Sequence, residues 1–351
     1  MGKKNLSRRS FLTSGAAAGA ATAAMALPTV AMSKELPSVS WRMQALWDGG
    51  TTPMTYEKLF VDRVSDLTGG KFKIRLFSGG QIVPSNKGFS AVRSGAVQMI
   101  KTYDGYAAGR DPVFAFTSSV PFGFTDPAQY AAWFYERGGL DIARAAYKKY
   151  GIHYIAPMIY GPEPIHSTFP IHSLDDMKGK KGRFVGFAAK VMEAFGVAVD
   201  QAATAQVYTE LAQGIIDFAD RGGLMANYDA GLYEVAKYVV VPGMHQPTTA
   251  TSYIANQKAY DALPQVYKDV LFVAAREAST AFNLYKVSQH PIMLQKFRDK
   301  GCTIIELDQD VRNAGRPIAE QVWRQTAEGN ELAEKALDSQ VKFMKQLGLF
   351  S

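Results

Sequence analysis

The sequence predicts an α/β protein of two similar lobes, each built from discontinuous stretches of chain. Three observations support this fold class. A helical pattern runs directly into an alternating strand pattern, a helix–glycine–strand unit occurs twice, and two stretches rich in proline and glycine separate these units. Two crossings between lobes leave a cleft where the lobes meet, which is a common position for a ligand site.

The first predicted elements are a helix and a strand. Residues 56–67 place Tyr56, Phe60 and Val64 at helical spacing with charged residues between them. Two glycines then end the helix, and residues 71–77 (KFKIRLF) alternate polar and apolar side chains, as a half-buried strand does.

The repeated unit lies at residues 90–99 (SAVRSGAVQM) and 209–218 (TELAQGIIDF). Each copy reads as a helix end, a capping glycine and a short apolar strand. We therefore expect one such unit in each lobe.

The crossings are predicted at residues 154–170, which contain four prolines, and at residues 241–251. They place lobe 1 at residues 34–160 with about 250–300, and lobe 2 at residues 161–249 with about 301–351. The last third is predicted helical over residues 263–288 and 310–347, with a break near Gly329.

The first 33 residues have the pattern of a twin-arginine signal peptide. Arg8 and Arg9 follow a basic start and precede a small-residue apolar stretch that ends near Ala31. We expect export to the periplasm and removal of this segment. Without its four basic residues the net charge of +7 becomes +3, too small an excess to favour nucleic-acid binding.

Several kinds of catalytic chemistry have no motif in the remaining sequence. Metal-protease, Walker, dinucleotide and serine-hydrolase motifs are absent. Cys302 is the only cysteine, which excludes an internal disulfide and suggests an inert buried thiol. The five histidines lack helical i, i+4 pairing, so a zinc site is not expected; His166 and His245 lie on the predicted crossings.

Several segments resemble the solute-binding proteins of tripartite ATP-independent periplasmic (TRAP) transporters. They are residues 68–81 and 91–99, residues 174–183 (LDDMKGKKGR) and residues 211–217 (LAQGIID), and the resemblance covers most of residues 41–275. The 2-oxo acid (α-keto acid) binding branch is resembled most, through residues 109–112 (GRDP), 120–122 (VPF), 186–192 (GFAAKVM) and 238–243.

The resemblance implies the two-lobed periplasmic solute-binding protein fold, with a hinge and a long C-terminal helix. It implies a receptor, not an enzyme, that delivers a small organic carboxylate to membrane permease subunits. It also implies that Arg183, after the Leu-x-x-Met-x-Gly motif, grips the carboxylate. A guanidinium offers two parallel donors that match the two oxygens of a carboxylate. The alternative is that Arg183 only tethers nearby backbone or an aspartate.

The branch further implies a Na⁺ or Ca²⁺ ion that bridges an acidic side chain and the ligand. The acid position falls on Asp220, and the implied metal set is Asp220, Arg221 and Gln246. Pro164 stands where an amide ligand is expected, although the neighbouring Glu163 is a possible oxygen ligand. Two other interpretations stay open: Arg221 supplies a second positive charge, or Asp220 and Arg221 form a structural ion pair.

Tyr106 is predicted to cover the ligand and donate one hydrogen bond, with core packing as the alternative. Phe187, Asn227 and Tyr228 are weaker candidates.

The expected ligand is a 2-oxo or 2-hydroxy monocarboxylate. A dicarboxylate is the runner-up because Arg221 adds charge, and a periplasmic lyase or hydrolase using Asp220 and Glu163 is the enzyme alternative. A sensor-kinase partner also stays open. A homodimer through a long helix in residues 310–347 is a further expectation.

Overall fold

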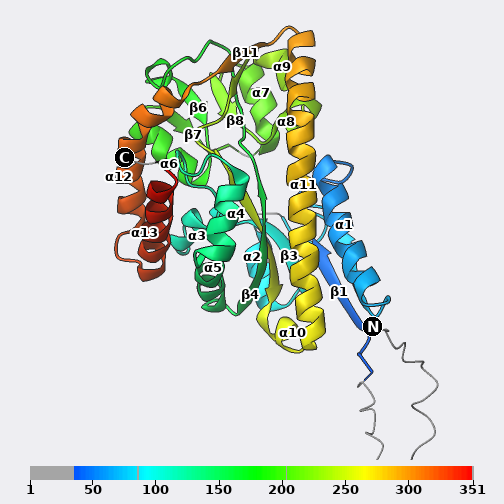
Figure 1. Cartoon of the computed structure of the whole chain (residues 1–351). Coiled ribbons are helices and arrows are strands. Elements are labelled where there is room, and N and C mark those ends of the chain that lie inside the picture. The colour runs from blue at the N-terminus through cyan, green and yellow to red at the C-terminus, as the bar shows by residue number, and fades with distance from the viewer. Residues whose placement is uncertain (1–34, 85–86, 203, 350–351) are drawn as a thin grey trace, which may run out of the picture. The chain divides into compact units, whose positions relative to one another are not determined.

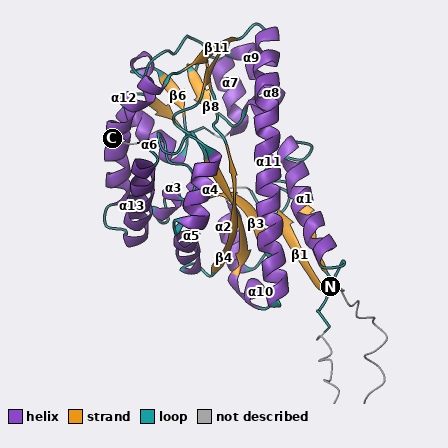
Figure 2. Cartoon of the chain, in the orientation of Figure 1, coloured by secondary structure: helices purple, strands orange, loops and turns teal. Residues whose placement is uncertain are grey.

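The computed structural model describes residues 35–84, 87–202 and 204–349 (Figure 1). The predicted signal peptide lies outside the described residues. Residues from Pro37 onward form one compact unit with two β-sheets, and Figure 2 shows the strands in two groups with helices around them. Within the described residues, no helix is both long and apolar enough to cross a membrane.

Sheet A has the strand order β2-β1-β3-β10-β4. Strand β1 is parallel to β2 and β3, while β10 runs antiparallel between β3 and β4. The strands are β1 (Val39–Gln44), β2 (Phe72–Phe77), β3 (Met99–Tyr103), β4 (Ile152–Tyr160) and β10 (Thr249–Asn256).

Sheet B has the order β11-β9-β5-β8-β6-β7. Strand β5 is antiparallel to β8 and β9, and the other neighbouring pairs are parallel. The strands are β5 (Ile165–Ser167), β6 (Lys181–Arg183), β7 (Ala198–Asp200), β8 (Phe218–Asp220), β9 (Tyr238–Val241) and β11 (Thr303–Glu306).

The helices and short 3₁₀ turns follow the predicted α/β pattern. They are α1 (Thr52–Leu67), α2 (Gly88–Ser94), η2 (Asp104–Ala107), α3 (Val113–Phe116), α4 (Pro127–Glu136), α5 (Gly139–Lys148), η3 (Asp175–Met177), α6 (Gly186–Ala194), η4 (Thr204–Gln206), α7 (Val207–Ala212), α8 (Leu224–Asp229), α9 (Leu232–Val235), α10 (Gln257–Asp261), α11 (Gln265–Asp299), α12 (Gln309–Ala327) and α13 (Glu331–Gln346).

The helix–glycine–strand unit occurs once in each sheet, as α2–β3 and α7–β8. Its glycines, Gly95 and Gly214, adopt left-handed φ values of 79° and 67°. Strand β3 starts only at Met99, later than the sequence suggested, because the amides of Gly95 and Ala96 close the helix end onto the Val92 and Ala91 carbonyls.

Two short segments carry the chain between the sheets, and each lies within one of the stretches, 154–170 and 241–251, in which a crossing is predicted. Residues 161–164 link β4 to β5, and residues 242–248 link β9 to β10. The segments touch: the Glu163 amide donates to the Gln246 carbonyl at 3.1 Å. Gly243 allows this approach, since a Cβ there would stand 1.7 Å from the Glu163 carbonyl oxygen.

The third connection is α11, a helix of 35 residues. It packs against α1 and β4 on the side of sheet A, and against α8 and β11 on the side of sheet B (Figure 1). This helix is the long helix of the C-terminal region.

The predicted break near Gly329 is confirmed, so residues 310–347 form two helices and not the one long helix expected for dimerisation. Gly329, with φ of 74°, and Asn330, whose side chain caps α13 by accepting from the Ala333 amide, divide the segment into α12 and α13. Helix α12 packs against α6, whereas α13 packs against α3 and α5.

Aromatic contacts join the part of the chain around sheet A to the part around sheet B. The rings of Phe116 and Phe187 pack edge to face at 5.2 Å, and Phe122 lies 5.2 Å from Phe195. One buried apolar cluster therefore runs from Ile254 of sheet A to Phe218 of sheet B.

Candidate ligand-binding site

The predicted site residues converge where the crossing segments leave the sheets. Arg183 ends β6 and Asp220 ends β8, and these strands are parallel neighbours with Arg183 opposite Ala219. Their carboxyl ends therefore lie at one edge of sheet B, the usual ligand edge of such sheets. Glu163 and Gln246 come from the two crossing segments and meet there.

Arg183 is 3% exposed and is held by three acceptors. Its Nε donates to the Ala202 carbonyl at 2.9 Å, Nη1 to the Asp220 carbonyl at 2.7 Å, and Nη2 to Thr204 Oγ1 at 3.4 Å. Since a guanidinium has five N–H groups, one on each terminal nitrogen has no partner among the residues that the structure describes. Arg183 therefore does tether nearby backbone, as the alternative interpretation held. These bonds still leave the two terminal N–H donors that a carboxylate requires.

Asp220 and Glu163 form a buried acid pair, 2% and 5% exposed. Tyr160 donates from its hydroxyl to Glu163 Oε1 at 3.0 Å. Burial, followed by the charge of Asp220, raises the pKa of Glu163 to about 8. Although burial acts in the opposite direction, His245 and Arg183 hold the pKa of Asp220 below its usual value. At neutral pH the pair therefore carries one negative charge, on Asp220.

His245 lies beside this pair, with Nε2 3.5 Å from Asp220 Oδ1. Its ring packs edge-on against Phe184. The sequence singled out His166 as well, but that side chain packs 5.2 Å from Phe297, and burial lowers its pKa to about 3. His166 is therefore a neutral core residue.

Tyr106 is on the η2 turn and is 48% exposed. Its ring contacts Tyr103 edge-on at 5.4 Å. Partial desolvation by the surrounding protein raises the pKa of this half-exposed phenol, and the charge of Arg183 opposes that rise, so the phenol is within electrostatic reach of the guanidinium. This position suits a group that covers a bound anion.

The remaining candidates make other contacts. Arg221 donates from Nη1 to the Ala226 carbonyl at 3.0 Å, so the Asp220–Arg221 ion pair is not formed within the described part of the chain. Phe187 packs on Phe116, and Tyr228 packs on Tyr233 and Phe297. The fully buried Asn227 donates to the Gly222 carbonyl at 2.7 Å. Cys302 is buried, as expected, and its thiol donates to the Tyr233 and Ala236 carbonyls at 3.8 and 3.9 Å.

Lys286 of α11 is a half-buried residue close to these candidates that the sequence analysis did not single out. Its Nζ lies over the Tyr160 ring, 4.1 Å from the centroid. Burial lowers the pKa of Lys286 to about 8, and the charge of Glu163 opposes this shift. In the sequence Lys286 looks like any other lysine of a long helix.

The donor set fits a hard cation in part. Asp220 Oδ1 is buried and accepts no hydrogen bond from any described residue, and Glu163 supplies further carboxylate oxygens. Among the described residues, no group of three or more His, Cys, Asp or Glu side chains could hold a metal ion. A cation would therefore need the amide oxygen of Gln246, a backbone carbonyl or the ligand itself. Arg221 could offer only its carbonyl, because its side chain is positive.

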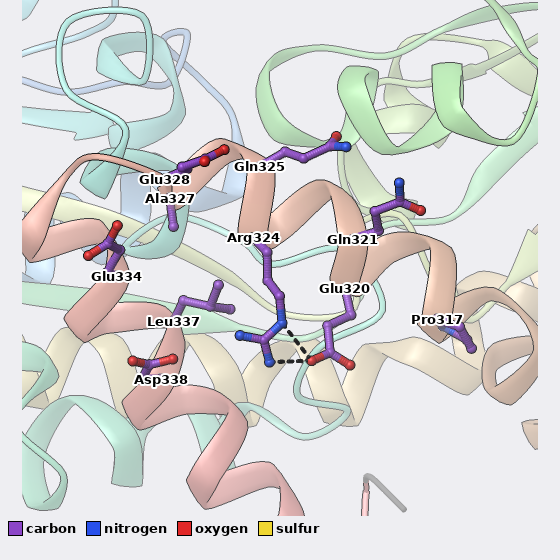
Figure 3. A pocket seen from close by; sticks show the side chains of 10 residues that line it. All are labelled: Pro317, Glu320, Gln321, Arg324, Gln325, Ala327, Glu328, Glu334, Leu337 and Asp338. Atoms are coloured by element: carbon purple, nitrogen blue, oxygen red, sulfur yellow. Dashed lines mark hydrogen bonds and ion pairs between the residues drawn. The ribbon is translucent and has the colours of Figure 1, made fainter.

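A hollow of about 750 Å³ lies elsewhere, between α12 and α13 (Figure 3). Arg324 and Glu320 form an ion pair across one turn of α12 inside it. None of the candidate site residues line this hollow; its lining is Pro317, Glu320, Gln321, Arg324, Gln325, Ala327, Glu328, Glu334, Leu337 and Asp338.

Comparison with known proteins places this geometry in a family. Residues 46–330 match the family described as bacterial extracellular solute-binding protein, family 7. The chain belongs to this family. A relative, the monocarboxylate 2-oxoacid-binding periplasmic protein of Nostoc sp., is 28% identical over 97% of this chain and 95% of its own length.

Solved structures of TRAP solute-binding proteins share the fold. A TRAP solute-binding protein of Pseudoalteromonas atlantica, with bound sodium and pyruvate, has a TM-score of 0.81 and 26% identity, covering 89% of this chain and 95% of that one. A TRAP solute-binding protein of Bordetella bronchiseptica, a dimer with calcium and picolinate in its occupied site, has a TM-score of 0.79 and 27% identity over 89% and 93%.

The resemblance stated from the sequence is therefore confirmed, as is the two-sheet α/β fold. This is a family of receptors that bind solutes and not of enzymes, so the lyase or hydrolase alternative has no support. The chain is a TRAP-type receptor for small carboxylates that acts outside the cytoplasm.

Proposed function

We propose that this protein binds a 2-oxo or 2-hydroxy monocarboxylate in the periplasm and delivers it to the membrane permease subunits of a TRAP transporter. The observation that carries the proposal is the buried Arg183 guanidinium beside the acid pair: within the described part of the chain, one N–H on each of its terminal nitrogens has no partner. The ligand named for the Nostoc relative and the pyruvate bound by the Pseudoalteromonas protein support it.

In this proposal Arg183 binds the carboxylate in a bidentate manner, and Tyr106 covers it and donates one hydrogen bond. If a Na⁺ or Ca²⁺ ion binds, Asp220, Glu163 and Gln246 would hold it, with Arg221 contributing at most its carbonyl. Such an ion supplies positive charge to the carboxylate and to the 2-oxo or 2-hydroxy oxygen. A second carboxylate on the ligand would meet the negative charge of Asp220, which favours a monocarboxylate over the dicarboxylate alternative.

Entry of a ligand requires the site to open, because Arg183, Asp220 and Glu163 are all nearly inaccessible. The two predicted lobes would separate about the segments 161–164 and 242–248, with α11 as the third connection. Closure would then remove the carboxylate from water and strengthen its bond to Arg183.

Thermal-shift screening of the mature protein tests the proposal. The panel contains pyruvate, longer 2-oxo acids, 2-hydroxy acids and dicarboxylates, each with Ca²⁺ or with chelator. A ligand that binds only the folded form raises the melting temperature, so 2-oxo monocarboxylates should give the largest shifts. Larger shifts with dicarboxylates, or none with any acid, would contradict the ligand class.

Two expectations stay predictions. Sequencing the N-terminus of the exported protein tests removal of the twin-arginine leader. Sedimentation tests the homodimer, for which the exposed apolar side chains of α11 now offer a better surface than residues 310–347; they are Val266, Val273, Leu284 and Val287.

A further inference from the structure

Phe122 has a backbone conformation that few side chains adopt. Among the described residues it is the only one other than glycine with a left-handed φ, which is 62°. A large side chain is rare there because its Cβ crowds the backbone, and such a residue persists only where surrounding contacts hold it. The side chain is fully buried, so the contacts that hold Phe122 are internal.

A backbone hydrogen bond ties Phe122 to the second crossing segment, residues 242–248. The Phe122 amide donates to the Met244 carbonyl at 2.7 Å. Met244 directly precedes His245 and Gln246 of the candidate site. The position of these two side chains therefore depends on the contact between Phe122 and the crossing segment.

The chain just before Phe122 runs alongside the same part of the molecule. Ser119 Oγ donates to the Thr248 carbonyl at 2.6 Å. The Ala250 amide, in the first turn of β10, donates to the Ser118 carbonyl at 2.7 Å. The crossing segment is therefore supported over its length, and Phe122 is at the end of this support.

The other contacts of Phe122 are with two helices near sheet B. Arg316 Nε of α12 donates to the Phe122 carbonyl at 3.1 Å, and the Phe122 ring lies 5.2 Å from the ring of Phe195 at the end of α6. The ring also lies against Gly315 of α12, where a Cβ would stand 2.3 Å from it. Glycine is less favourable than alanine inside a helix, and the approach of this ring is a physical reason for glycine at this position.

These contacts join parts of the chain that separate if the site opens in the proposed manner. Phe122 is in predicted lobe 1, whereas α6 connects two strands of sheet B and α12 packs against α6. Separation of the lobes must therefore withdraw the Phe122 ring from Gly315 and Phe195 and break its bond from Arg316. It also removes the contacts that hold Phe122 at a left-handed φ.

We propose that Phe122 is a latch between the lobes. Its ring and carbonyl hold α6 and α12 in the closed arrangement, and its amide positions the segment that carries His245 and Gln246. The inference rests on the proposed function, since it concerns closure over the same site. It makes Phe122 a positioning residue that controls how long a bound acid stays, through the lobes and not by contact with the acid.

Two variants test the latch from its two sides. Phe122→Ala removes the ring, and Gly315→Ala places a Cβ where the ring lies. Phe114→Ala is the matched control, because Phe114 is equally buried and its ring contacts Phe89 and Tyr147 of predicted lobe 1. Phe122→Leu replaces Phe122→Ala if circular dichroism shows the latter unfolded.

Small-angle X-ray scattering of the ligand-free mature protein, recorded on the eluate of a size-exclusion column, gives a readout that needs no ligand. Both latch variants should have a larger radius of gyration than wild type, because a smaller fraction of the molecules is closed. The Phe114→Ala control should keep the wild-type radius. A wild-type radius in both latch variants would overturn the inference.

Stopped-flow kinetics with pyruvate give the second readout. The dissociation rate should rise at least about tenfold in both latch variants while the association rate changes less than about threefold, because a bound acid leaves only when the lobes open. The control should change neither rate; an equal rise in the control would show that loss of any core ring has this effect, and would overturn the inference. Failure of the wild type to bind any 2-oxo acid would instead contradict the proposed function, while the scattering data would still decide the role of Phe122.

Discussion

Replacing Arg183 by lysine separates its charge from its geometry. Lysine keeps the positive charge, but its three donors sit on one nitrogen and cannot reproduce a planar fork. The guanidinium now bonds the Ala202 and Asp220 carbonyls and Thr204 Oγ1. One ammonium cannot serve these acceptors and two ligand oxygens together.

The size of the effect follows from the bonds lost. A buried carbonyl left without its donor costs about 1–3 kcal/mol, so two such carbonyls predict a loss of about 2–6 kcal/mol in the free energy of unfolding. Loss of one charged hydrogen bond to the ligand, worth about 1.5–3 kcal/mol, predicts a Kd for pyruvate roughly 10–100-fold higher.

Urea unfolding and isothermal titration measure the two effects separately. Arg144→Lys is the control, because Arg144 makes a single long bond, 3.4 Å, to the Tyr154 carbonyl of sheet A. If Arg183→Lys binds pyruvate within twofold of wild type, the ligand does not depend on the guanidinium fork and the reasoning is refuted.

Three further changes test the surroundings of the site. Glu163→Gln should flatten the pH dependence of the free energy of unfolding. The folded-state pKa of Glu163 is raised from 4.5 to about 8, so the protonated carboxyl stabilises the fold below about pH 4.5 and this stabilisation is lost as the pH rises towards 8. Urea unfolding at a series of pH values measures it. Gly243→Ala should destabilise by more than about 2 kcal/mol, since its Cβ would meet the Glu163 carbonyl, whereas Gly161→Ala, with 3.7 Å to its nearest neighbour, should not. Lys101→Met should cost about 3–5 kcal/mol in chemical unfolding, because it leaves the fully buried Glu57, now 3.9 Å from the ammonium, without a counter-charge.

Each of these predictions has a contrary result. Parallel pH profiles for wild type and Glu163→Gln would mean that Glu163 titrates normally. Equal stabilities of Gly243→Ala and Gly161→Ala would show that the crossing segments can move apart without loss. An unchanged Lys101→Met protein would show that Glu57 is accommodated as the neutral acid.

Local sequence patterns predicted most of the helices and strands. The alternation in residues 71–77 and the glycines Gly95 and Gly214 are short-range signals, and each specified its element. The pairing of β4 with β10, about 100 residues apart in the chain, and the packing of α13 against α3 and α5 depend on contacts that no local period encodes. The split at Gly329 was visible as a break, but which sides of the two helices are buried was not.

The candidate site shows the same difference between what short-range signals predict and what depends on long-range contacts. Arg183 and Asp220 became candidates through the resemblance to TRAP receptors, and the structure places each at the end of a strand of one sheet. Lys286 did not, because its position at the Tyr160 ring depends on α11 packing against strands of both sheets, and a helical lysine is ordinarily exposed to solvent. His245 was noted only for its place on a crossing; its contact with Asp220 needed the fold.

A crystal structure of the mature protein with pyruvate tests the central claim most directly. The account predicts the pyruvate carboxylate against both terminal nitrogens of Arg183, with Tyr106 above it. Pyruvate bound at another place, or an Arg183 fork that makes no contact with it, would contradict the account.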